Sequence, residues 1–173
     1  MKNTLRIFAL IAALLASLNA ASQTLWQSTK HGMSIEETAK AVPGSIAPVD
    51  AAGRLANGAV EKLRLESYEV AGRQFQVKLY FLGEALEQVT LSLSETVTYD
   101  SARVIYERLR QALSSLYGPV EELPEKRGIL SLRQADWRSG RTNISLLAMG
   151  VGQSPATLNI NYQVRVARDA DKL

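Results

Sequence analysis

Between residues 74 and 81 every second position is apolar and the positions between them are polar, which is the pattern of a half-buried strand. Residues 60–70 and 88–93 alternate in the same way. Short turns at 71–73 and at Gly83-Glu84 separate the three segments. The sequence therefore predicts an antiparallel meander with one apolar and one polar face.

Two segments have the period of a helix instead. The longer one follows Thr98, a good N-cap, and ends at Gly118-Pro119, which stops a helix. Its apolar residues recur at steps of three and four, and we expect four of them to pack on the strands that carry Phe75, Val77, Leu79 and Ile160: Ile105, Leu109, Leu113 and Leu116. The shorter helix begins after Ser34, with Glu37 at capping-box spacing, and ends before Pro43-Gly44.

The rest of the chain predicts loops and a second group of strands. Residues 44–59 are rich in Gly, Ala, Pro and Asp and predict an exposed loop, and residues 121–127 predict a charged loop. Strands are expected at 128–137, 142–150 and 157–166. The order helix, three strands, helix, three strands predicts an α+β fold, built from two helix-plus-antiparallel-meander units at about 26–95 and 98–168. Each helix would cover its own half, whether the halves share one sheet or form two.

The N-terminal residues predict that the protein is exported. Lys2 and Arg6 precede an apolar run from Ile7 to Leu18, and small residues follow around Ala20. This is the pattern of a secretory signal peptide over residues 1–20, cleaved between 20 and 22. No second run of this kind is present, so we expect one domain over residues 21–173, periplasmic or secreted, with no transmembrane segment in the mature chain.

Charge and cysteine content narrow the possible partners. The net charge of the 173 residues is +3, and removal of Lys2 and Arg6 leaves +1. Such a balance gives no electrostatic reason to expect nucleic acid as a partner. The sequence has no cysteine, which excludes disulfides, thiolate chemistry and the lipid anchor of bacterial lipoproteins. Packing alone must stabilise the fold.

No catalytic or metal motif stands out. His31 is the only histidine, so a triad would have to use it with Ser28 or Ser34, and no nucleophile elbow surrounds any serine. One histidine without cysteine does not make a usual zinc site, and we expect no metal and no cofactor. Paired carboxylates could support a hydrolase, and the candidates by residue type are Glu36, Glu37, Glu84, Glu87, Glu121 and Glu122.

A candidate binding surface comes from the polar faces of two strands. Amide and guanidinium groups line one face of the last strand, and a similar polar set lines one face of the second strand. Amides form hydrogen bonds without needing charge, so such a face can bind a protein or a glycan, although a solvated sheet face has the same pattern. The residues are Asn159, Asn161, Gln163 and Arg165 on the last strand, and Gln74, Gln76, Lys78 and Tyr80 on the second.

The segment W-Q-S-T-K-H-G-M-S-I-E-E, beginning at Trp26, resembles the mature start of a family of small exported proteobacterial proteins of unknown function. The resemblance continues through residues 57–60, 80–82, 86–91, 139–144 and 159–165, and so covers nearly the whole mature chain. The family has no established activity, so the resemblance implies no functional residues. The helix-plus-meander repeat is similar to the β-lactamase-inhibitor-protein-like architecture, also seen in small outer-membrane assembly lipoproteins, which have the lipidated cysteine that this chain lacks.

These observations favour a non-enzymatic periplasmic module that binds a protein or an envelope polymer. The alternative is a hydrolase acting on envelope material through carboxylates that the sequence does not single out. A cleft holding two carboxylates with raised pKa values would favour the enzyme, and an open polar sheet would favour the binding module.

Overall fold

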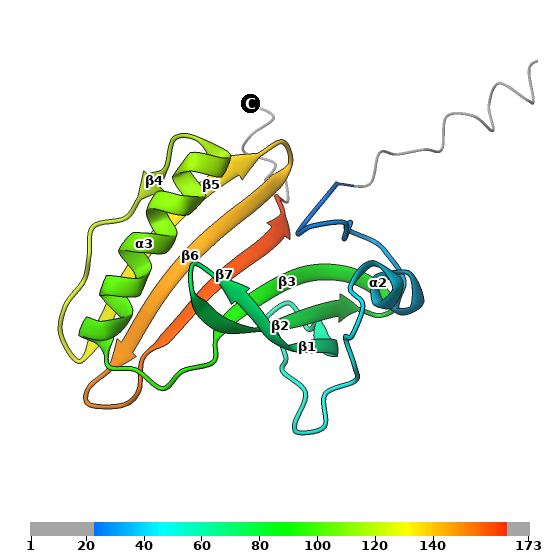
Figure 1. The fold of residues 1–173 in the computed structure, drawn as a ribbon, viewed down its shortest axis with the longest axis horizontal. Helices are drawn as coiled ribbons and strands as arrows, with labels where there is room; N and C mark the ends of the chain where they lie inside the picture. The colour runs from blue at the N-terminus through cyan, green and yellow to red at the C-terminus, as the bar shows by residue number, and fades with distance from the viewer. Residues whose placement is uncertain (1–22, 166–173) are drawn as a thin grey trace, which may run out of the picture.

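The computed structural model describes residues 23–165 (Figure 1). The predicted signal peptide and the end of the chain after residue 165 lie outside these residues. Within them, seven strands form one antiparallel sheet in the order β1-β2-β3-β7-β6-β5-β4. The strands are β1 (Val60–Val70), β2 (Arg73–Leu82), β3 (Ala85–Leu93), β4 (Glu121–Glu122), β5 (Leu130–Ser139), β6 (Thr142–Val151) and β7 (Thr157–Val164).

The two groups of strands join in the middle of the sheet, where β3 pairs with β7. This pairing decides the question that the sequence left open, because both groups belong to one sheet. Two-residue turns connect β1 to β2, β2 to β3 and β5 to β6. Between Val70 and Arg73, both Ala71 and Gly72 have positive φ, at 51° and 76°, as a tight hairpin with the right-handed twist of its strands requires.

The long helix α3 (Tyr99–Tyr117) begins and ends where the sequence predicts. The Thr98 side chain accepts a hydrogen bond from the backbone N–H of Ser101, and Gly118 follows the last turn with φ of 84°. The helix packs on β5, β6 and β7 (Figure 1). Ile105, Leu109 and Leu113 are buried, and they belong to the same core as Trp137, Ile144, Leu146 and Ile160.

Two details of the predicted helix packing are wrong. The strand that carries Phe75, Val77 and Leu79 is β2, which lies in the other half of the sheet from the strands beneath α3. Leu116 is 73% exposed and is not a core residue. The helical period identifies the apolar side of α3 correctly. However, only some of the residues on this side contact the sheet, and Leu116 is not one of them.

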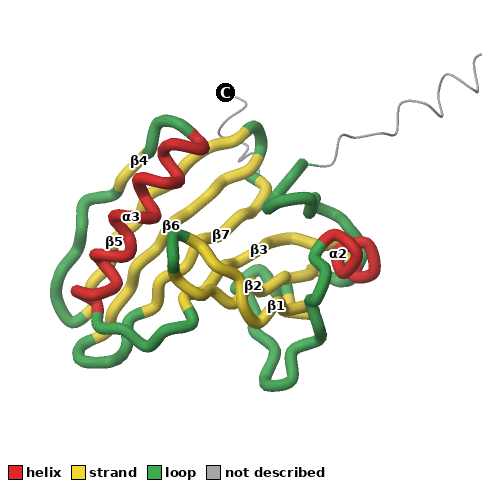
Figure 2. The backbone as a smooth tube through the Cα atoms, in the orientation of Figure 1, coloured by secondary structure: helices red, strands yellow, loops and turns green. Residues whose placement is uncertain are grey.

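The short helix α2 (Ile35–Ala41) has the predicted capping box. Glu37 N–H donates to the Ser34 hydroxyl, and the Ser34 N–H donates to the Glu37 carboxylate. The prediction that this helix covers the first half of the sheet is wrong. With seven residues it is only about 10 Å long, and it lies beside the ends of β1 and β3 (Figure 2). The protein is therefore mostly sheet, with one covering helix.

The segment predicted as a charged loop contains a further strand. Glu121 and Glu122 form β4, which pairs with Asp136 and Ala135 at the edge of β5. The strand is stabilised by ion pairs to both sides: Glu121 pairs with Arg138 at 2.9 Å, and Glu122 pairs with Arg110 of α3 at 3.2 Å. The second group of strands therefore has four members rather than three.

Candidate functional site

One face of the sheet carries α3, and the opposite face, called here the outer face, carries the polar residues. The strand register places seven polar or charged side chains in one row that crosses every strand. From one edge of the sheet to the other, the row is Glu121, Asp136, Ser145, Asn161, Thr90, Lys78 and Arg64. We call this set the polar row. Because neighbouring strands lie about 4.8 Å apart, these side chains form a continuous line.

The predicted residues of β7 lie at the centre of the outer face. Asn161 Oδ1 accepts a hydrogen bond from the Thr90 hydroxyl at 2.9 Å, and the same hydroxyl accepts one from Gln88 Nε2 at 2.9 Å. Asn159 is half-buried opposite Ser92, and Gln163 is exposed opposite Gln88. The amides of β7 therefore continue directly into the polar residues of β3.

Arg165 follows the last residue of β7 rather than lying within the strand. Its backbone N–H donates to the Arg141 carbonyl at 2.8 Å, and its side chain is exposed. It therefore borders the outer face.

The predicted residues of β2 lie on the same face, with β3 between them and β7. Gln74 Oε1 accepts a hydrogen bond from the Ser67 hydroxyl at 2.7 Å, and Gln76 Nε2 donates to the Glu66 carboxylate at 2.6 Å. Lys78 is half-buried in the polar row between Thr90 and Arg64. The two predicted sets are thus parts of one surface, but they do not touch each other.

Tyr80 departs from the prediction. It is on the outer face but only 7% exposed, because the loop before β1 folds back over it. A Cβ atom added to Gly53 would lie 2.8 Å from the Tyr80 hydroxyl and 3.1 Å from Glu61 Oε2, so the loop backbone rests directly on these groups. Burial, followed by the charge of Glu61, raises the pKa of Tyr80. Tyr80 is therefore no part of an open binding surface.

A buried ion pair holds this loop. Arg64 donates to both carboxylate oxygens of Glu61, at 2.5 and 3.1 Å, and Asp50 of the loop pairs with Arg64 at 2.7 Å. Gly53 N–H donates to Glu61 Oε2 at 2.9 Å. The hydrogen bond with Glu61 raises the pKa of Arg64, against the opposing effect of burial. The cluster secures residues 50–53 against β1, and its groups are all engaged with one another.

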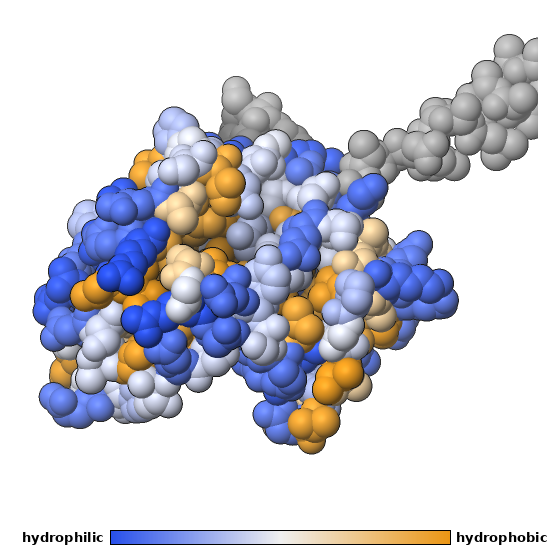
Figure 3. Space-filling model, in the orientation of Figure 1, coloured by the Kyte–Doolittle hydropathy of each residue, from blue (hydrophilic) through white to orange (hydrophobic). Residues whose placement is uncertain are grey.

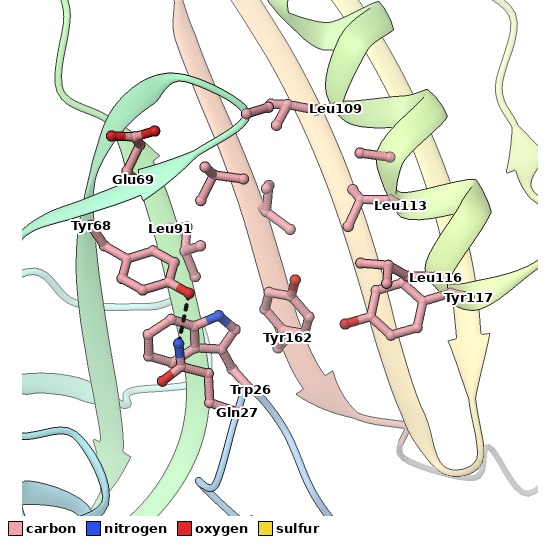
Figure 4. Close-up of a pocket in the computed structure, with 14 residues that line it drawn as sticks. Trp26, Gln27, Tyr68, Glu69, Leu91, Leu109, Leu113, Leu116, Tyr117 and Tyr162 are labelled. Carbon is pink, nitrogen blue, oxygen red and sulfur yellow. Dashed lines mark hydrogen bonds between the residues drawn. The ribbon is translucent and has the colours of Figure 1, made fainter.

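The sequence analysis missed an apolar groove on the face that carries α3. The groove has a volume of about 350 Å³ and lies between α3 and the β1–β2 hairpin, with β3 and β7 as its floor (Figure 4). Figure 3 shows apolar residues gathered between the helix and the hairpin, with polar residues around them. The apolar lining residues include Val70, Leu91, Leu109, Ala112, Leu113, Leu116 and Ile160.

Four aromatic side chains form one end of the groove. Trp26 meets Tyr68 edge to face with 5.0 Å between ring centroids, and Gln27 Nε2 donates to the Tyr68 hydroxyl at 2.7 Å (Figure 4). Tyr117 of α3 meets Tyr162 of β7 at 6.5 Å. Burial, followed by the neighbouring Tyr117, raises the pKa of Tyr162. A signal for this site was present in the sequence: Trp26 is an aromatic residue in an otherwise polar segment.

Most of the residues considered for catalysis have structural partners. His31 lies 3.0 Å from Glu87 and joins the entry segment to β3. Glu36 pairs with Lys40, and Glu37 belongs to the capping box. Over residues 23–165, no group of three His, Cys, Asp or Glu side chains could hold a metal ion. In the same range, no helix has the length and apolar character to cross a membrane.

No protein-family model matches the chain, and no curated protein or solved structure matches it.

Proposed function

We propose that this protein is a non-enzymatic binding module of the bacterial cell envelope that recognises its partner through the outer face of the sheet. The observation that carries the proposal is the polar row, in which half-buried Asp136, Asn161 and Lys78 are partly exposed while Ser145, Thr90 and Arg64 are buried. From Asp136 to Lys78 the row consists of groups that donate or accept hydrogen bonds, and neither helix covers it.

The chemistry of the face indicates the class of partner. Its centre holds the neutral amides Asn159, Asn161 and Gln163, with carboxylates toward one edge and Lys78 toward the other. Neutral hydrogen-bonding groups suit a protein surface or a hydroxyl-rich envelope polymer. A highly charged polyanion such as nucleic acid would need a basic surface instead.

The envelope location rests on the export signal and on the resemblance to small exported proteobacterial proteins. The hydrolase alternative gains no support from the carboxylates. Among the candidate carboxylates, Glu37 has a lowered pKa because of its hydrogen bonds with Ser34, whereas a general acid needs a raised one.

The test uses the mature protein as bait in an envelope extract, with bound material quantified by mass spectrometry. The double variant Asn159→Ala with Gln163→Ala removes two amides from the outer face and leaves the Asn161–Thr90 hydrogen bond intact. A matched control, Gln111→Ala with Ser115→Ala, removes polar groups from the exposed side of α3. We expect the outer-face variant to lose a specific partner by tenfold or more, since interface truncations of about 2 kcal/mol or more are typical of central contacts.

Both variants should keep the melting temperature of the wild type, because none of the four side chains is buried and substitutions outside the core usually change stability by less than about 0.5 kcal/mol. Equal recovery of every bound component by the wild type and the outer-face variant would contradict the proposal.

A further inference from the structure

The groove on the α3 face is a narrow trough with a buried floor. Leu91 and Ile160 of the floor and Leu109 of the helix wall are each 1% exposed, whereas Ala112 and Leu116 on the rim are exposed. A slender molecule can contact such a floor, but the surface of a folded partner would meet only the rim. The groove is therefore a candidate site for a small ligand.

The volume of the groove limits the size of that ligand. Its volume of about 350 Å³ lies near the lower end of the roughly 300–1,000 Å³ of small-molecule pockets. An apolar cavity of about 150 Å³ holds benzene, with its six carbon atoms. On the same scale, this groove suits a molecule of about a dozen non-hydrogen atoms.

The shape of the apolar part favours an aliphatic chain. Leu109, Leu113 and Leu116 lie on successive turns of α3 and line one wall of the groove. They extend over about 10 Å of the helix, at 1.5 Å per residue. A chain lying along this wall would remove its own apolar surface and that of the leucines from water.

Phenolic hydroxyls gather at one end of the groove. Figure 4 shows the hydroxyls of Tyr68 and Tyr117 pointing toward Tyr162 from two sides. The Tyr68 hydroxyl accepts a hydrogen bond from Gln27 Nε2 at 2.7 Å and keeps its own proton to donate. Burial, followed by the neighbouring Tyr117, raises the pKa of Tyr162, so this hydroxyl also stays protonated. Neutral hydroxyls both donate and accept hydrogen bonds, which suits an alcohol, ester or amide head group.

The charges of the lining do not suit an ionic head group. None of the 14 lining residues is Lys, Arg or His, so an anionic head would have no cationic partner. Glu69 is the one charged residue of the lining, but it follows Tyr68 in β1, and successive side chains of a strand point to opposite faces. Its carboxylate points away from the tyrosines in Figure 4, so a cationic head would have no counter-charge either.

We propose that the groove binds an uncharged amphiphile with a single aliphatic chain and about a dozen non-hydrogen atoms. Its chain lies along α3, and its hydroxyl, ester or amide head lies at Tyr68, Tyr117 and Tyr162. This site does not depend on the proposed binding role of the outer face, since the two lie on opposite sides of the sheet.

Displacement of a fluorescent dye tests the class of ligand. The purified protein would be loaded with N-phenyl-1-naphthylamine, a neutral dye whose emission rises in apolar surroundings. Three ligands with the same ten-carbon chain would compete with the dye: 1-decanol, decanoate and decyltrimethylammonium. We expect 1-decanol to act at a concentration roughly tenfold or more below that of either ion, because burial of an unpaired charge is unfavourable. Displacement by either ion at the same or a lower concentration, or none by 1-decanol, would overturn the proposal.

Paired variants test whether binding takes place in the groove. Ala112→Phe adds a ring at the rim, and the matched control Gln111→Phe adds the same ring at the neighbouring exposed position, which does not line the groove. We expect Ala112→Phe to weaken 1-decanol binding roughly tenfold or more, and Gln111→Phe to leave it unchanged, with the wild-type melting temperature in both. Unchanged binding by Ala112→Phe would place the ligand elsewhere and refute the assignment.

A third variant tests the position of the head group. Tyr117→Phe removes one hydroxyl and keeps the ring, so it should weaken 1-decanol binding about fivefold, as loss of one hydrogen bond does. Binding equal to that of the wild type would show that the head does not lie at the tyrosines.

Discussion

At the scale of single residues, burial separates side chains that the helical period groups together. Leu109 and Leu116 lie on the same apolar side of α3, yet Leu109 is 1% exposed and Leu116 is 73% exposed. We expect Leu109→Ala to lower the free energy of unfolding by about 2–5 kcal/mol, the range for removal of a buried leucine side chain. Leu116→Ala should change it by less than about 0.5 kcal/mol. Urea denaturation of the two variants gives both values, and similar losses at the two positions would disprove the packing described for α3.

Gly53 is a second residue whose substitution should have a clear effect on stability. A Cβ atom at this position would approach the Tyr80 hydroxyl and Glu61 too closely, and both groups are held in place by the buried Arg64 cluster. We expect Gly53→Ala to destabilise the protein by about 1–3 kcal/mol, the usual effect of overpacking a filled site. Gly128→Ala is the matched control, because no atom lies within 4 Å of its added Cβ. Thermal unfolding should show a lower melting temperature for Gly53→Ala alone, and equal melting temperatures would show that the loop does not rest on Tyr80.

These residues also show how far the sequence predicts the site. Period-two alternation placed Gln74, Gln76, Lys78 and Tyr80 on one face correctly, because alternation in a strand depends on local geometry. The covering of Tyr80 depends on a contact with Gly53, 27 positions earlier, and no local pattern contains it. The groove was missed for the same reason: Trp26, Tyr68 and Tyr117 come from three separate segments that only the tertiary fold brings together.

At the scale of secondary-structure elements, capping signals predicted the helices well, and tertiary partners were harder to predict. Thr98 and Ser34 start α3 and α2 as expected, since a cap is read from neighbouring residues. Strands were expected at β5, β6 and β7, but the packing of α3 on β5 and β6 instead of β2 was not predicted, and neither was the short strand β4, because both depend on long-range contacts. An ion-pair network joins these elements: Glu107 of α3 contacts Arg110 at 2.9 Å and Arg133 of β5 at 2.5 Å.

This network makes stability depend on pH. Burial alone would raise the pKa of Glu107, but the hydrogen bonds and charges of Arg110 and Arg133 outweigh burial and hold it below its ordinary value of 4.5. A carboxylate with a lowered pKa in the folded state contributes stability above its unfolded pKa, and that contribution is lost as the pH falls through the folded pKa. We therefore expect the free energy of unfolding to decrease below about pH 4.5.

Glu107→Gln should flatten this decrease, because glutamine takes up no proton. Urea titrations at a series of pH values between 6 and 3 would compare the two proteins. Parallel curves for the wild type and Glu107→Gln would show that the ion pair of Glu107 does not contribute to acid sensitivity.

At the scale of the whole molecule, the sheet separates two surfaces with different chemistry. The outer face carries neutral amides and the polar row, while the α3 face carries the apolar groove. The single sheet follows from the β3–β7 pairing, which local sequence patterns do not specify. Without disulfides, the arrangement is stabilised by the continuous core beneath α3 and the entry segment.

Export is a property of the whole chain, and it has its own test. Lys2, Arg6 and the apolar run predict cleavage between residues 20 and 22. The intact mass of protein from the periplasmic fraction should correspond to a chain that begins at residue 21 or 22. A full-length cytoplasmic product would contradict both the export and the envelope role.

Lysine acetylation tests the outer face as the binding surface most directly. Lys78 lies in the polar row, whereas Lys40 lies on α2 with a side chain that is 73% exposed, and its reactivity serves as an internal control. Acetylation of the free protein and of its complex with the captured envelope partner would be compared by peptide mass spectrometry. We expect acetylation of Lys78 to fall several-fold in the complex while that of Lys40 stays unchanged. Equal acetylation of Lys78 in the free and bound protein would contradict the account.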